Sequence, residues 1–151
     1  MSIPIIPDPV PEQIQTDTVT IPKPRRNRAS AKKAGSSFER AQADWLAERL
    51  NDDRIDRRVK GGVKDRGDIG GVRTIRGGRV VIEAKSYSSD RIQIKKWLNE
   101  AAVEAANDDA AIAVVMVKVR GTADPAEQLV CMTANTFAAL LEGGPDIVRG
   151  A

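Results

Sequence analysis

The stretch GDIGGVRTIRGGRVVIEAK, residues 67–85, decides the fold that we predict for this chain. Its last six residues, 80–85, have the apolar character of a buried strand, and the glycine-containing turn at 74–78 precedes them. This pattern predicts a β-hairpin. With the hairpin centred near residue 75 or 76, paired positions add up to about 151. That register places Asp68 opposite Glu83.

The hairpin carries two acids and a lysine in an arrangement that suits metal chemistry. Side chains alternate along a strand, so Glu83 and Lys85 share one side, roughly 6 to 7 Å apart, while Val80 and Ile82 face the other. Asp68 and Glu83 side by side repel each other and favour a hard cation, and oxygen ligands select Mg²⁺, or Mn²⁺ as a substitute, over zinc. Lys85 could orient or deprotonate a water and counter charge on a phosphate. The pattern predicts a metal-dependent nuclease.

Composition removes most competing chemistries. The chain has no histidine, which excludes Ser-His triads, histidine zinc sites and histidine general bases. Its single cysteine, Cys131, cannot form an internal disulfide and is expected to be a buried, inert thiol. Residues 1–7 do not resemble a secretory signal, and no run approaches the roughly 20 apolar residues that span a bilayer. We expect a soluble, cytoplasmic protein associated with DNA.

The length of 151 residues suits one domain preceded by a tail. Residues 1–22 are rich in proline and carry no basic side chain, and residues 23–33 carry six positive charges and no negative one. We therefore predict a disordered, proline-rich and then basic tail over 1–33 and a nuclease domain over 34–151. The basic arm, with Lys32 and Lys33, suits nonspecific contact with phosphates, although a solubilising tail has the same composition.

Apolar periodicity predicts the elements of the domain. The expected elements are a helix from Ser36 to Leu50, strands near 55–59, 68–73 and 79–85, a helix over 95–107, a central strand over 110–119, a strand over 127–133 and a short helix over 135–142 closed by Gly143.

Several of these residues have a second interpretation. Ser36 to Glu39 has the form of a capping box, in which Glu39 would serve only the helix start. Asp65 is a rival for the metal position of Asp68, although it lies in the loop with no apolar strand behind it. The Glu83-x-Lys85 pattern also occurs by chance on exposed strands.

Basic side chains cluster on the segments that flank Asp68. They are Arg54, Arg57, Arg58, Lys60, Lys64, Arg66, Arg73, Arg76 and Arg79. A charge run is often only a solvated face, but DNA held against two carboxylates needs cations, so we expect phosphate contacts from Arg57, Arg58, Lys60, Lys64 and Arg66, in addition to the basic arm. Such contacts carry no base code, which indicates cleavage selective for DNA structure.

With Gly35-Ser36-Ser37-Phe38-Glu39-Arg40, Asp68 and Glu83-Ala84-Lys85 in place, the sequence resembles the PD-(D/E)XK nuclease superfamily, and more closely its archaeal-type Holliday junction resolvases, over about residues 33–141. The resemblance implies an α/β, restriction-endonuclease-like αβββαβ core with a central mixed sheet flanked by helices. It also implies a homodimer, Mg²⁺-dependent cleavage of branched DNA, active-centre roles for Glu39, Asp68, Glu83 and Lys85, and the backbone carbonyl of Ala84 as a metal ligand. Gly67 departs from the superfamily's proline.

Two alternatives to a Holliday junction resolvase stay open. One is another nuclease of the same superfamily, such as a restriction-like, flap or repair endonuclease. The other is a noncatalytic DNA-binding protein that retains the fold. The presence of Asp68, Glu83 and Lys85 together argues against the second, because binding alone does not require all three.

Overall fold

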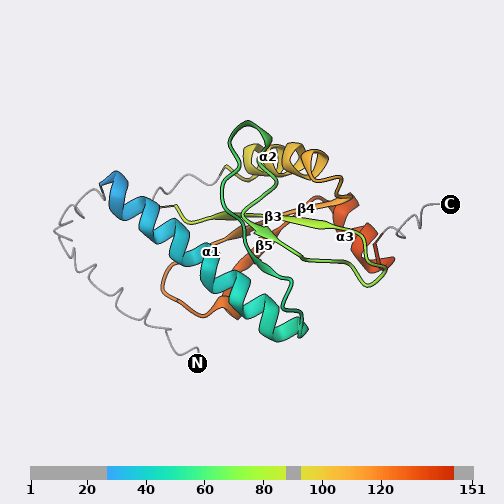
Figure 1. The fold of residues 1–151 in the computed structure, drawn as a ribbon, viewed down its shortest axis with the longest axis horizontal. Coiled ribbons are helices and arrows are strands. Elements are labelled where there is room, and N and C mark those ends of the chain that lie inside the picture. Colours follow the sequence, from blue (N-terminus) through green and yellow to red (C-terminus); the bar gives the residue numbers. More distant parts are fainter. Residues whose placement is uncertain (1–26, 88–92, 145–151) are drawn as a thin grey trace, which may run out of the picture.

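The computed structural model describes residues 27–87 and 93–144, and the predictions for residues 1–26 lie outside these ranges. A five-stranded mixed sheet lies between helices (Figure 1). In chain order the elements are α1 (Arg28–Leu50), β1 (Asp56–Arg57), the 3₁₀ helix η1 (Gly62–Lys64), β2 (Ile69–Gly70), β3 (Val80–Lys85), α2 (Ile94–Asn107), β4 (Ile112–Val117), the 3₁₀ helix η2 (Pro125–Glu127), β5 (Leu129–Cys131) and α3 (Ala134–Leu141). The predicted α/β class with a central mixed sheet flanked by helices is confirmed.

Strand order follows chain order, β1-β2-β3-β4-β5. Among the strands of the described residues, β3 and β4 are the only parallel neighbours, with α2 between them in the chain, and the other neighbours are antiparallel. Ile69 pairs with Ile82, which is the register predicted for the hairpin. The strands β1, β2 and β5 are shorter than predicted, so the continuous core of the sheet is β3 with β4.

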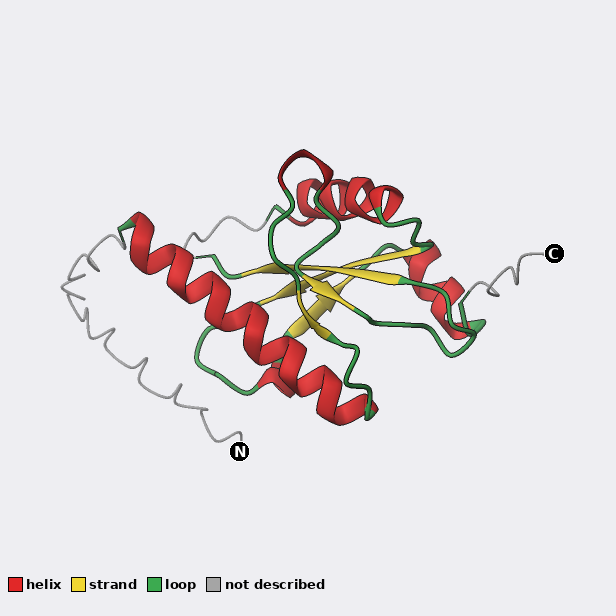
Figure 2. Ribbon diagram, viewed as in Figure 1, coloured by secondary structure: helices red, strands yellow, loops and turns green. Residues whose placement is uncertain are grey.

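The sheet is covered on both faces, as expected for a parallel pair joined by a helix. On one face, Phe38 and Ala43 of α1 pack with Ile82, Val114 and other sheet residues, and side chains of α3 join them. On the other face, α2 packs against β4, with Ala101 against Val115. Figure 2 shows the long loop that carries η1 rising from the sheet beside α2, and the side-chain amide of Asn107 donates to the carbonyl of Asp65 in this loop (2.9 Å).

The first helix begins earlier than predicted. It starts at Arg28, with the side chain of Asn27 accepting a hydrogen bond from the backbone N–H of Ser30 (2.8 Å). Residues 28–33 therefore belong to the helix, and the domain boundary predicted at residue 33 falls inside it. Ser36 lies in the helix interior, so the capping box was wrong. Lys32 and Lys33 are exposed on the first turns.

Gly67 has a backbone reason to differ from proline. Its φ is +87°, whereas the proline ring fixes φ near −65°. A Cβ at this position would lie 2.7 Å from the side chain of Val81 and 3.0 Å from the carbonyl oxygen of Ile82. Both the positive φ of Gly67 and its close approach to β3 therefore favour glycine immediately before Asp68.

Among the helices that the structure describes, none is both long enough and apolar enough to cross a membrane.

Candidate active site

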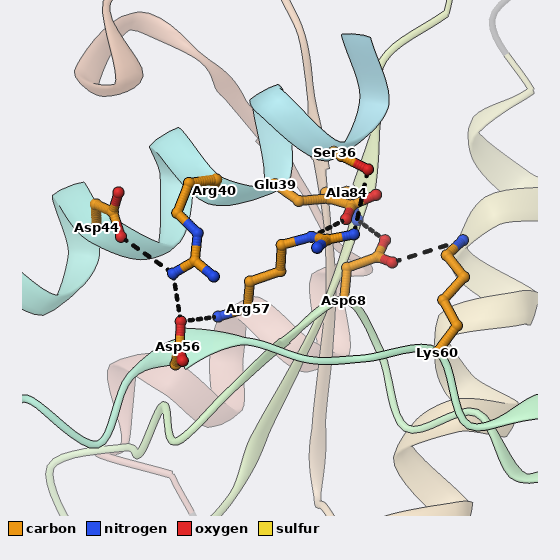
Figure 3. A network of polar contacts seen from close by, with 9 residues as sticks. All are labelled: Ser36, Glu39, Arg40, Asp44, Asp56, Arg57, Lys60, Asp68 and Ala84. Carbon is orange, nitrogen blue, oxygen red and sulfur yellow. Dashed lines mark hydrogen bonds and ion pairs between the residues drawn. The ribbon is translucent and has the colours of Figure 1, made fainter. Parts of the chain in front are cut away.

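Asp68 lies where β2 begins, beside β3. Its backbone N–H donates to the carbonyl of Ile82 (2.9 Å), and its Oδ2 accepts a hydrogen bond from the backbone N–H of Ala84 (2.9 Å). The residue is only 5% exposed. The nearest cation recorded for it is the exposed Lys60, whose Nζ is 3.8 Å from Oδ1 (Figure 3). Asp68 is thus a buried carboxylate with a weak ionic partner.

Glu83 and Lys85 face α2, on the side of β3 opposite to the buried Val80 and Ile82, as the period-two geometry predicts. The Nζ of Lys85 donates to Oε1 of Glu83 (2.7 Å) and to Oε2 of Glu100 on α2 (3.0 Å). Lys85 therefore holds an acid from the strand and an acid from the helix at one point.

Glu39 reaches the same region from α1. It is buried, and its Oε2 accepts a hydrogen bond from Nε of Arg57 (2.6 Å), whose guanidinium also donates to the hydroxyl of Ser36 (3.2 Å). Figure 3 shows Glu39 and Asp68 on neighbouring elements, with Arg57 directed at the helix and Asp68 directed at Ala84. The negative charge of Glu39 raises the pKa of Asp68, which agrees with this proximity.

Burial dominates the electrostatics of the site. Burial raises the pKa of Asp68 to about 7, the hydrogen bond from Ala84 opposes this shift, and the charge of Glu83 adds to it. Burial also raises the pKa of Glu83 and of Glu104, whose carboxyl groups contact each other. For Lys85, burial lowers the pKa, but the bonds and charges of its two glutamates outweigh burial, and its pKa is raised. Lys85 is therefore an ammonium group at neutral pH.

Two acids of α2 were missed by the sequence analysis. Glu100 binds Lys85, and Glu104 contacts Glu83. They lie four residues apart, on the face of α2 that carries the core residues Ala101 and Ala105. Their position in the sequence could have revealed them. Both acids lie on the apolar face of the predicted helix, and an acid on a buried face needs a partner from the sheet.

The oxygen atoms around Asp68 suit a hard divalent cation. In the described residues no three His, Cys, Asp or Glu side chains form a preformed metal-ligand group. Mg²⁺, however, is usually held by one or two carboxylates and keeps several waters. Buried Oε2 of Glu104 has no hydrogen-bond partner among the described groups, and burial together with the charge of Glu83 raises the pKa of Asp68. Added positive charge would relieve both, so this donor set fits Mg²⁺ or Mn²⁺.

The backbone of Ala84 is oriented towards the same centre. The carbonyl of Lys85 accepts from the N–H of Lys118, on the β4 side of β3. Successive carbonyls alternate between the two edges of a strand, and the N–H and C=O of one residue point to the same edge. The carbonyl of Ala84 is therefore directed to the edge where its N–H meets Asp68.

The predicted phosphate contacts divide into two groups. Lys60, Lys64 and Arg66 are exposed on the loop that leads to Asp68. The guanidinium groups of Arg57 and Arg58 instead bind carboxylates of this chain, Arg57 with Glu39 and Arg58 with Asp108 (2.9 Å).

The rival carboxylate, Asp65, is half-buried at the end of η1. Its Oδ1 accepts the backbone N–H of Arg66 (2.9 Å). The side chain is thus turned back onto its own loop, whereas Asp68 is turned onto β3.

Comparisons with protein-family models, with curated proteins and with solved structures find no match to this chain.

Proposed function

We propose that this α/β protein is a DNA endonuclease that hydrolyses phosphodiesters with Mg²⁺, and that a four-way junction is its preferred substrate. The observation that carries the proposal is the grouping of acids around Asp68, where β2 meets β3. The charges of Glu83 and of Glu39 on α1 both act on Asp68, and Lys85 is hydrogen-bonded to Glu83. The element order α1-β1-β2-β3-α2-β4 also agrees with the αβββαβ core of the PD-(D/E)XK nucleases that the sequence resembles.

In this proposal Asp68, Glu83 and the backbone carbonyl of Ala84 would hold the metal. A bound Mg²⁺ would lower the pKa of a water and neutralise charge on the phosphate. Lys85, an ammonium held by two glutamates, is suited to orient that water and to stabilise the negative charge that develops on the phosphate oxygens. Such a role uses the charge of Lys85 rather than proton abstraction.

The remaining residues hold the substrate and position the acids. Lys60, Lys64 and Arg66 supply positive charge on the loop beside the carboxylates and are assigned to phosphate contacts. Glu39 fixes Arg57 against α1, and the negative charge of Glu39 raises the pKa of Asp68. These basic groups contact the DNA backbone, which supports selectivity for shape over sequence.

Cleavage assays on a panel of four-way junction, flap, nicked, linear duplex and single-stranded DNA test the proposal. The wild-type chain should cut the junction best with Mg²⁺, and Glu83→Gln should bind it in Ca²⁺ without cutting it in Mg²⁺. A preference for flap or nicked DNA would indicate another nuclease of the same kind. Binding without metal-dependent cleavage of any substrate would leave the noncatalytic alternative.

We also propose that the protein acts as a homodimer, because a four-way junction needs two equivalent cuts and a two-fold assembly supplies two active centres. The strand β5 is an edge of the sheet and exposes Leu129 and Val130, and α3 exposes Phe137 and Leu141. Exposed apolar side chains on an edge strand favour an interface. A monomer in sedimentation equilibrium at working concentration would contradict this part of the proposal.

A further inference from the structure

A second polar site, whose lining includes none of the carboxylates proposed to bind the metal, lies near the end of α2. It is a pocket of about 240 Å³. This volume corresponds to roughly eight waters, which is ample for a tetrahedral oxyanion. Its lining consists of Arg58, Arg66, Gly71, Val72, Arg73, Arg79, Val80 and Asp108. Four of these eight residues are arginines and one is an acid, so the lining carries a formal charge of +3.

Two of the arginines are fixed in place by the end of α2. Arg58 donates to Oδ2 of Asp108 (2.9 Å) and, through its other terminal nitrogen, to the backbone carbonyl of Arg66. Arg79 donates to the backbone carbonyl of Asp108 (2.8 Å). Asp108 is buried, 6% exposed. The guanidinium groups are thus positioned before any ligand arrives, which lowers the entropy cost of binding.

The strand β2 is shaped to let Arg58 lie across it. A Cβ on Gly70 would stand 2.2 Å from Nε of Arg58, and a Cβ on Gly71, whose φ is +83°, would stand 2.0 Å from the carbonyl oxygen of Arg54. Any larger residue at Gly70 would displace the guanidinium. Gly70 therefore leaves room for the Arg58 side chain, and Gly71 allows the close approach of the Arg54 backbone.

Capping the end of α2 does not account for all of this positive charge. That role engages Arg58 and Arg79, each of which keeps further N–H donors from the five that a guanidinium carries. Arg73 donates to the carbonyl of Gly77 (3.1 Å), and the guanidinium of Arg66 makes no hydrogen bond or ion pair with the described residues. Four arginines that keep unused donors thus line one small space.

We propose that this pocket binds a phosphate group. A planar guanidinium group can bind two phosphate oxygens at once. A ligand with a single carboxylate would leave part of the positive charge of the lining unmatched. The same chemistry comes from a backbone phosphate of DNA or from a small free phosphate. The DNA source would place a second phosphate beside the proposed cleavage centre, because Arg58 N–H donates to the carbonyl of Asp68 (2.7 Å). The site itself does not depend on the cleavage activity.

The test uses Arg66→Ala/Arg73→Ala in the full chain. These two residues contribute positive charge to the pocket but make no hydrogen bond with Asp108. The hydrogen bonds from Arg58 and Arg79 to Asp108 therefore remain in the variant. The matched control is Arg49→Ala/Lys118→Ala, which removes the same charge from exposed positions away from the pocket. Melting curves check that both variants fold.

Calorimetric titration with inorganic phosphate, in metal-free buffer at constant ionic strength, should show saturable binding by the wild type. The pocket variant should lose about tenfold or more in phosphate affinity, since hydrogen bonds between charged groups are the stronger class, and the control should bind phosphate nearly as the wild type does. Absence of saturable binding by the wild type, or an equal loss in both variants, would overturn the proposal.

Metal-free binding of labelled duplex DNA identifies the source of the phosphate. If the pocket takes a DNA phosphate, inorganic phosphate should compete with DNA, and the pocket variant should lose more DNA affinity than the control. If it takes a small phosphate, inorganic phosphate should bind the pocket at saturation without displacing DNA, whatever DNA affinity the loss of Arg66 from its loop removes. Neither readout involves cleavage, so failure of the nuclease proposal would leave this result standing.

Discussion

Replacement of Asp68 by asparagine should stabilise the metal-free protein, although it should abolish cleavage. Burial raises the pKa of Asp68 from 3.8 to about 7. The folded state therefore favours the protonated carboxyl, and wild-type stability is greatest below the unfolded-state pKa and falls as the pH rises through about 7. The full difference corresponds to about 4 kcal/mol. Asparagine keeps an oxygen for the N–H of Ala84 and carries no charge.

The comparison between two pH values gives the measurable quantity. Between pH 5 and pH 8 the wild type should lose about 2 to 3 kcal/mol more unfolding free energy than Asp68→Asn. Urea unfolding in a chelator, at both pH values, measures this difference. Asp53→Asn is the matched control, because Asp53 is exposed and its replacement removes the same charge. It should follow the pH dependence of the wild type.

Addition of Mg²⁺ separates burial from metal binding. A ligand that binds only the folded state stabilises it. Mg²⁺ at pH 8 should therefore raise the stability of the wild type and of Asp53→Asn and have little effect on Asp68→Asn. Parallel pH profiles for the wild type and Asp68→Asn would refute the argument from burial, and equal stabilisation of all three by Mg²⁺ would refute Asp68 as a metal ligand.

Three further changes test other parts of the structure. Glu39→Gln keeps an acceptor for Arg57 but removes the charge, so we expect unchanged helicity by circular dichroism and weak cleavage; normal turnover would leave Glu39 a structural role only. Gly67→Ala should lower the free energy of unfolding by about 1 to 3 kcal/mol, because its positive φ strains other residues, and an unchanged urea midpoint would contradict this. Lys32→Ala/Lys33→Ala should weaken junction and duplex binding by similar factors and reduce the slope of log affinity against log salt by about 2; loss of junction preference alone would disprove the nonspecific role.

The hairpin and the second half of the domain could be predicted because their signals are local. A glycine turn and an apolar strand set the pairing of Ile69 with Ile82, and apolar periodicity gave α2, β4 and α3 within a few residues. The start of α1 could not be predicted in the same way. Its first turns are exposed and have no apolar face, so helix propensity and the cap at Asn27 decide its start.

The partners of the charged residues could not be predicted either. Arg57 and Arg58 are neighbours in a basic run, yet one side chain meets Glu39 on α1 and the other meets Asp108 at the end of α2. Alternation along a strand places the two side chains on opposite faces of the sheet. Which acid each arginine meets there depends on how the helices are rotated against the sheet. For the same reason Glu100 of α2 emerged as a partner of Lys85 only from the structure.

The distribution of cations explains why Asp68 is the expected point of metal binding. Glu39 is paired with Arg57 at 2.6 Å, and Glu83 is paired with Lys85 at 2.7 Å. Asp68 is equally buried, but the cation recorded beside it, Lys60, is exposed and 3.8 Å away. A buried carboxylate without a close partner is costly in a folded protein. We infer that a divalent cation binds at Asp68, where pairing within the chain is weakest, and offsets the cost of the buried charge. The stabilisation of the wild type by Mg²⁺ measures this effect directly.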